Sequence, residues 1–243
     1  MVIIRRIGWF LGLSWVAVTI GLQFVPFKTA EPYTLGGEGG WLPLQLASYS
    51  FLHFAWDHLI SDLIMLAGLV RLAGDYLRPE GFVRVYTLGA VGGGALRVWM
   101  ASLLGRGPLE SLGVGPWLAL DTLFVVLAAL DPTRRVFFLG EKAAETIRGG
   151  GWLLLGVLGV FYYSILAAAW LWMLLLFVSN WGVVFLSMSR VRVVWLAAAV
   201  VLSSLGLYVW SSRPGAVLSY AILIVAAVVY GLAERLWAKH TVR

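Results

Sequence analysis

An apolar segment of membrane-spanning length begins in the run Tyr49-Ser-Phe-Leu-His53-Phe-Ala-Trp-Asp-His58-Leu-Ile-Ser-Asp62-Leu-Ile-Met65. An ionisable side chain inside a bilayer costs several kcal/mol unless it is partnered, so such residues usually face the interior of a helix bundle and carry function. His58 and Asp62 are four residues apart, which puts them one turn apart on one face of a helix. We therefore predict a spanning helix whose polar face, with His53 just upstream, forms a functional site.

The composition extends this prediction to the whole chain. Hydrophobic residues make up 61% and charged residues 12% of the 243 residues, whereas charged residues are about a quarter of an ordinary soluble domain. Apolar runs such as 152–188 are too long for the alternating strands of a membrane barrel. The sequence predicts an all-α polytopic membrane protein without a soluble domain of any size. Cysteine is absent, so disulfides and thiolate chemistry are excluded.

Loop charges predict the orientation of the spans. The net charge of +6 comes from Lys and Arg concentrated in alternate loops and at both ends of the chain, which indicates a cytoplasmic-membrane protein with both termini cytoplasmic rather than a nucleic-acid binder. A single asparagine and an excess of Arg over Lys are typical of a thermophilic or high-GC prokaryote. The expected spans are residues 7–25, 57–77, 82–104, 112–130, 151–168, 170–189, 193–211 and 215–237.

Two loops and two spans have features of their own. Residues 27–55 form a long external stretch, and we expect its apolar run 41–46 to lie in the outer leaflet. Residues 141–148 of a cytoplasmic loop predict a short surface helix. In the third span, the spacing of Gly89 and Gly93 favours close helix approach, and Arg97 is expected to extend its guanidinium to the outer interface. Asp121 is too short to do so and is expected to be protonated or paired within the bundle.

The chain resembles the rhomboid family of intramembrane serine proteases in several motifs. Phe51-Leu52-His53, His58 and position 62 reproduce the family's His, His and Asn spacing at the start of the second span. The run Leu112-Gly113-Val114-Gly115-Pro116 lies where the family has its Gly-x-Ser-Gly nucleophile motif, and Leu77, Phe82 and Tyr86 match more loosely. The resemblance implies a six-helix bundle over residues 1–189, followed by two additional spans in 190–243.

The departures from the family pattern concern catalysis. Gly115 occupies the nucleophile position, no histidine occurs between His58 and His240, and Asp62 replaces the Asn. An ionised Asp accepts hydrogen bonds and would repel an oxyanion. The resemblance implies a scaffold that binds transmembrane segments of client proteins, and the departures imply the loss of hydrolysis. We therefore expect a pseudoprotease in contact with membrane lipids, with no catalytic residue, cofactor, metal or nucleic acid. The residues of its retained pocket would be His53, His58, Asp62, Arg97, Gly113 and Gly115.

Several alternatives stay open at this point. Ser111 could act as a displaced nucleophile in an active protease, with His53 or His58 as its base. Asp62, Arg97 and Asp121 could belong to a transporter, with Asp121 in a proton or ion pathway. His53, His58 and Asp62 form a plausible metal-ligand set. The plainest alternative is that His58 and Asp62 are a buried polar pair that fixes helix register.

Overall fold

The computed structural model describes residues 18–22, 24–36, 42–53, 56–105, 115–136, 141–146, 190–210 and 213–241. Most of these residues are helical, which confirms the all-α prediction. The predicted spans at 151–168 and 170–189 lie outside the described residues, as does most of the span at 7–25.

Long helices coincide with the other five predicted spans. The first is α4 (Trp56–Ala73). A continuous helical stretch follows, made of α5 (Pro79–Thr87), a π-helical turn η3 (Leu88–Gly92) and α6 (Gly93–Leu103). The remaining helices are α7 (Trp117–Leu130), α11 (Val193–Trp210) and α12 (Pro214–Thr241). Helices α5 and α12 begin with proline, whose fixed φ and missing N–H suit the first helical position.

Membrane-spanning length is reached by one helix of the described part. Within α12, residues Pro214–Trp237 are long and apolar enough to cross a bilayer by length and composition, with a mean hydropathy of 2.4 over the best window. The apolar segments Trp117–Leu130 and Val193–Gly206 are shorter. This supports a membrane protein in coarse outline; the eight-span arrangement stays a prediction.

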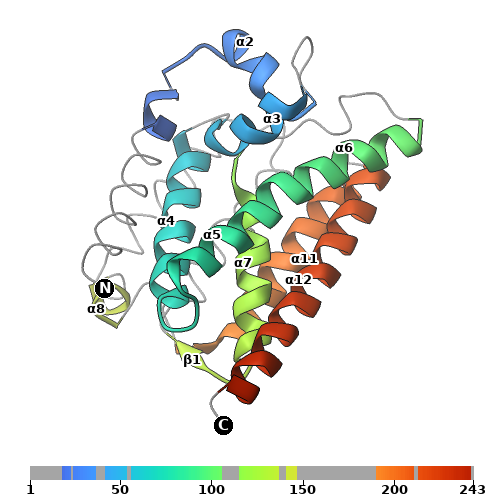
Figure 1. Ribbon diagram of the computed structural model, residues 1–243. Helices are drawn as coiled ribbons and strands as arrows, with labels where there is room; N and C mark the ends of the chain where they lie inside the picture. The colour runs from blue at the N-terminus through green and yellow to red at the C-terminus, as the bar shows by residue number, and fades with distance from the viewer. Residues whose placement is uncertain are drawn as a thin grey trace.

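Helix α7 forms the centre of the molecule, with α4, α5, α6, α11 and α12 arranged around it (Figure 1). Its residues Leu118–Ala128 are all buried. The main hydrophobic core combines buried side chains of α4, α5, α7, α11 and α12. Residues 190–241 are thus packed into the same core as the helices before residue 189, although the predicted domain boundary at residue 189 itself stays a prediction.

Glycines let these helices approach closely, as the sequence predicted for Gly89 and Gly93. A Cβ atom on Gly89 would lie 2.5 Å from the Cα of Ala119 in α7. A Cβ atom on Gly93 would lie 2.8 Å from the Cδ2 of Leu223 in α12. The two glycines therefore join the α5–α6 stretch to two different helices.

Short elements gather at the two ends of the helix bundle (Figure 1). One end carries α2 (Phe27–Ala30), η1 (Glu31–Tyr33), α3 (Leu42–Ser48) and η2 (Tyr49–Phe51). The predicted interfacial run 41–46 lies largely in α3. At the other end, β1 (Arg135–Val136) pairs antiparallel with β2 (Val191–Arg192). The short helix predicted for 141–148 is confirmed as α8 (Glu141–Thr146).

Lysine and arginine residues of the described part are distributed unequally between these two ends. The α3 end carries Lys28 and Arg213. The β1 end is much richer in arginine, with Arg71, Arg78, Arg84, Arg134, Arg135, Arg190, Arg192 and Arg235.

Candidate functional site

His53 and Asp62 form a buried pair at the α3 end of α4. The Nε2 atom of His53 lies 3.1 Å from Oδ2 of Asp62, and both side chains are at most 5% exposed. His53 lies in the segment before α4, which returns the imidazole to the second turn of that helix. Asp62 thus contacts His53, whereas the prediction from sequence relied on the four-residue spacing between Asp62 and His58. The side chain of His58 lies outside the described residues, so the metal-ligand and His58–Asp62 hypotheses stay predictions.

Gly115 is a backbone junction at the start of α7. Its φ of 88° lies in the left-handed region, which favours glycine. Its N–H donates a 2.9 Å hydrogen bond to the carbonyl of Tyr49. The Tyr49 hydroxyl in turn donates to the carbonyl of Ala90 in η3, at 2.7 Å. The position that resembles the family's nucleophile is therefore buried and holds two segments together; Gly113 and Ser111 lie outside the described residues.

Arg97 is buried in the bundle, contrary to the expectation that it reaches the outer interface. Only 3% of the residue is exposed. Its Nη1 donates to the hydroxyl of Tyr208 in α11 at 3.5 Å, and its guanidinium carbon lies 5.3 Å from the centre of the same ring. The aromatic face and hydroxyl of Tyr208 give the cation an interior partner, because a ring face attracts positive charge. Snorkelling is therefore unnecessary.

Asp121 is paired within the bundle, one of the two states that the sequence predicted for it. The hydroxyls of Ser204 and Tyr220 each donate to its Oδ2 at 2.7 Å. The three residues come from α7, α11 and α12, and all are buried. We call these three residues the Asp121 junction. Its partners lie in the two helices that the sequence placed outside the six-helix bundle.

Arg97, Tyr208 and the Asp121 junction form a connected series. The rings of Tyr208 and Tyr220 lie 5.5 Å apart between centres, so Arg97 is linked through Tyr208 to the Asp121 junction. His53, Asp62, Arg97 and the Asp121 junction are all buried, which closes these side chains off from solvent.

This arrangement limits what the described residues can do chemically. Hydrolysis requires a nucleophile, a base and access for substrate and water. Ser204 is buried, and its hydroxyl donates a hydrogen bond to the Asp121 carboxyl group. The same carboxyl oxygen also accepts a hydrogen bond from the Tyr220 hydroxyl. Among the described residues, no group of three or more His, Asp or Glu side chains is arranged to hold a metal ion.

Comparisons with protein-family models, curated proteins and solved structures return no match to this chain. The rhomboid resemblance rests on the chain's own residues, above all the spacing of His53, His58 and position 62.

Sequence reasoning missed the residues that partner the predicted ones. Tyr49, Ser204, Tyr208 and Tyr220 all lie in segments that were read only as spans or loops. A usable signal exists, because Ser204 is a hydroxyl in the middle of an apolar run and such groups commonly bond to another helix. The sequence does not say which helix, since that depends on how the bundle packs.

Proposed function

We propose that this protein is a multi-pass membrane protein with a rhomboid-like scaffold, that it does not hydrolyse peptide bonds, and that it binds transmembrane segments of client proteins. The observation that carries the proposal is the Gly115 junction. The position where the family resemblance expects a serine hydroxyl is a left-handed glycine whose N–H is bonded to Tyr49. A nucleophile cannot act from a residue that has no side chain.

The charge distribution supports a cytoplasmic location for the β1 end. Arginine is abundant at that end and scarce at the α3 end, and cytoplasmic loops carry the excess of Lys and Arg. Helix α12 runs from the α3 end to the β1 end (Figure 1), which supports a cytoplasmic C-terminus.

The apolar outer faces of the bundle are the surfaces open to a client helix. Trp99 of α6, Leu202 of α11 and Val225 of α12 are exposed by 56%, 68% and 63%. Photo-crosslinking residues at these three positions would sample three faces without disturbing the Gly115 junction. We expect one face to capture transmembrane segments, identified by mass spectrometry and displaced by a synthetic peptide of the captured segment. Capture of lipid alone at all three positions contradicts client binding.

Absence of hydrolysis is tested separately. The purified protein should not react with a fluorophosphonate probe and should not cleave a model transmembrane substrate, with an active rhomboid protease as the positive control. Labelling that disappears in Ser111→Ala would overturn the proposal in favour of an active protease with a displaced nucleophile.

A second candidate, proton or ion translocation, is favoured by the Asp121 junction. A carboxyl group shared by two hydroxyls inside an apolar bundle is a feature of proton relays as well as of structural joints. Flux in proteoliposomes that is lost in Asp121→Asn would support translocation, and absence of flux in the wild-type protein would exclude it.

A further inference from the structure

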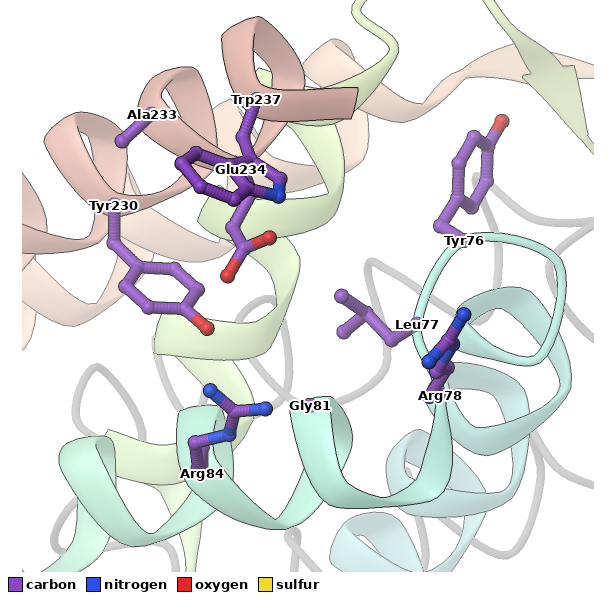
Figure 2. A pocket seen from close by; sticks show the side chains of 9 residues that line it. All are labelled: Tyr76, Leu77, Arg78, Gly81, Arg84, Tyr230, Ala233, Glu234 and Trp237. Atoms are coloured by element: carbon purple, nitrogen blue, oxygen red, sulfur yellow. The ribbon is translucent and has the colours of Figure 1, made fainter. Parts of the chain in front are cut away.

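A pocket lies at the β1 end of the bundle, between the first turns of α5 and the last turns of α12 (Figure 2). Its volume is about 740 Å³. The turn between α4 and α5 closes one side. Leu77 and Gly81 contribute apolar surface, while Arg78, Arg84, Tyr230, Glu234 and Trp237 contribute the polar and aromatic lining. None of the residues of the predicted site belongs to this lining.

The charges of the pocket leave an excess of one positive group. Arg78 and Arg84 oppose a single carboxylate, Glu234, which lies one turn beyond Tyr230 in α12. In the part of the chain that the structure describes, neither guanidinium forms a salt bridge. Figure 2 shows the Arg84 guanidinium directed toward the Tyr230 hydroxyl, across the space that also receives Glu234. Such a pocket suits an anion with one charge.

The depth of the pocket matches a membrane interface. The span-length part of α12 ends at Trp237, and Trp and Tyr are enriched where a spanning helix meets the headgroups. Exposed apolar side chains of α12 lie beside the lining residues in the sequence, including Val229 and Leu236. A ligand in the pocket would therefore have its polar part beside the arginines and an apolar surface next to it.

We propose that this pocket binds the phosphodiester headgroup of an anionic glycerophospholipid, with Arg78 and Arg84 contacting the phosphate oxygens. Guanidinium groups bind phosphate through paired, charge-assisted hydrogen bonds. A phosphodiester carries one negative charge, equal to the excess in the pocket, and the acyl chains would lie against α12. The proposal rests on the membrane placement proposed above but not on client binding.

Native mass spectrometry of the full-length protein in detergent tests the proposal, with phosphatidylglycerol and phosphatidylcholine as probes. We expect phosphatidylglycerol to bind at least tenfold more tightly, and Arg78→Gln with Arg84→Gln to remove that preference. Arg135→Gln with Arg192→Gln is the matched control, because it removes two exposed arginines from the same end outside the pocket and should leave the preference unchanged.

Two further measurements complete the test. The first fills the pocket without changing its charge, and the second asks whether the headgroup binds without its acyl chains. Gly81→Leu should block binding with both arginines present, because a Cβ at Gly81 has room, 3.7 Å from Leu77, for a side chain that grows into the pocket. Glycerophosphoglycerol, the same phosphodiester headgroup without acyl chains, should bind far more weakly than the lipid. Three outcomes would overturn the proposal: equal binding of the two lipids, a preference that survives the double arginine variant, or binding of glycerophosphoglycerol as tight as that of the lipid.

Discussion

Asp121 joins three helices through one carboxylate oxygen, so its substitution should separate hydrogen bonding from charge. In Asp121→Asn, the amide oxygen can still accept from Ser204 and Tyr220, and we expect the free energy of unfolding to fall by about 1 kcal/mol or less. In Asp121→Leu, two buried hydroxyls lose their acceptor, and an unsatisfied buried group costs about 1–3 kcal/mol. We expect the free energy of unfolding to fall by about 2–4 kcal/mol for the two hydroxyls together, measured by denaturant unfolding in detergent micelles.

The control is a double-mutant cycle of Asp121→Leu with Ser204→Ala. If Asp121 acts through these hydrogen bonds, the second substitution should cost less in the Leu background than in the wild type, because residues in one network couple. Additive losses would show that Asp121 acts through other contacts.

Gly115 allows a direct test of the closed nucleophile position. Gly115→Ser restores the hydroxyl that the family resemblance expects, but in a left-handed backbone that costs a side-chain residue roughly 1–2 kcal/mol. His53 is already paired with Asp62. We therefore expect destabilisation without fluorophosphonate labelling. Gly115→Ala should be destabilised equally and is the matched control; labelling of the Ser variant alone would refute this account.

At the scale of single residues, the sequence predicted that a buried polar group needs a partner but did not predict which residue the partner is. Asp121 was expected to be paired or protonated, because its cost in an apolar span is a property of one residue and its surroundings. The partners of Asp121 and Arg97 were not predicted, and Arg97 was wrongly expected at the interface. Ser204, Tyr208 and Tyr220 lie more than 80 residues from the groups they contact, and that proximity arises only from packing.

At the level of elements, Gly89 controls the distance between the α5–α6 stretch and α7. A Cβ at this position would lie 2.5 Å from the backbone of Ala119, so the helices must separate. Overpacking a core usually costs about 1–3 kcal/mol, and occasionally more. Because the backbone must shift here, we expect Gly89→Ala to lower the free energy of unfolding by about 2–4 kcal/mol. Thermal unfolding in detergent would measure it.

Gly206 in α11 is the matched control for that substitution. A Cβ there has no atom within 4 Å. Gly206→Ala should be neutral or stabilising by up to about 1 kcal/mol, because alanine is the better helix former. Equal effects of the two substitutions would mean that helix propensity, not close approach, sets their outcome.

The connection between α4 and α7 at the β1 end depends on Asp131. It accepts hydrogen bonds from Tyr76 at 3.2 Å and from the Thr133 hydroxyl at 2.9 Å. Arg134 bonds both Tyr76 and Asp75, at 2.9 and 2.6 Å. Partial burial acts to raise the pKa of Asp131, but hydrogen bonds from Thr133, Tyr76 and the Arg134 backbone outweigh it and lower that pKa.

A lowered pKa gives Asp131 a defined effect on pH-dependent stability. A carboxyl group whose pKa falls on folding stabilises the protein above its unfolded pKa of about 3.9, and that stabilisation is lost as pH falls through the folded value. We expect Asp131→Asn to lower stability by about 1 kcal/mol near neutral pH, a typical hydrogen-bond contribution at a partly exposed site. The difference from wild type should shrink as pH falls from neutral through the folded-state pKa of Asp131. A constant difference across this range would show that charge is not involved.

At the scale of the whole molecule, the positions of the helices could be predicted better than the way the helices are grouped into domains. Five predicted spans coincide with helices because apolar length and flanking Gly or Pro are local properties. The division at residue 189 came from the family resemblance, which says nothing of α11 and α12. Their packing against α7 depends on Gly231 and on complementary side chains such as Tyr220, which meet their partners only in the assembled bundle.

The orientation of the whole molecule in the membrane follows from the charges at its two ends and from the direction of its helices. Because the chain has no cysteine, single introduced cysteines can test this orientation directly. Single cysteines at Lys28 and at Arg192 place one thiol at each end, on residues that are both exposed. If arginine excess marks the cytoplasmic side, a membrane-impermeant maleimide added to intact spheroplasts should label Lys28→Cys and should label Arg192→Cys only after permeabilisation. The reverse pattern would invert the protein in the membrane. It would also place the proposed lipid pocket in the opposite leaflet, whereas labelling of both cysteines in intact spheroplasts would rule out a transmembrane arrangement of these two ends.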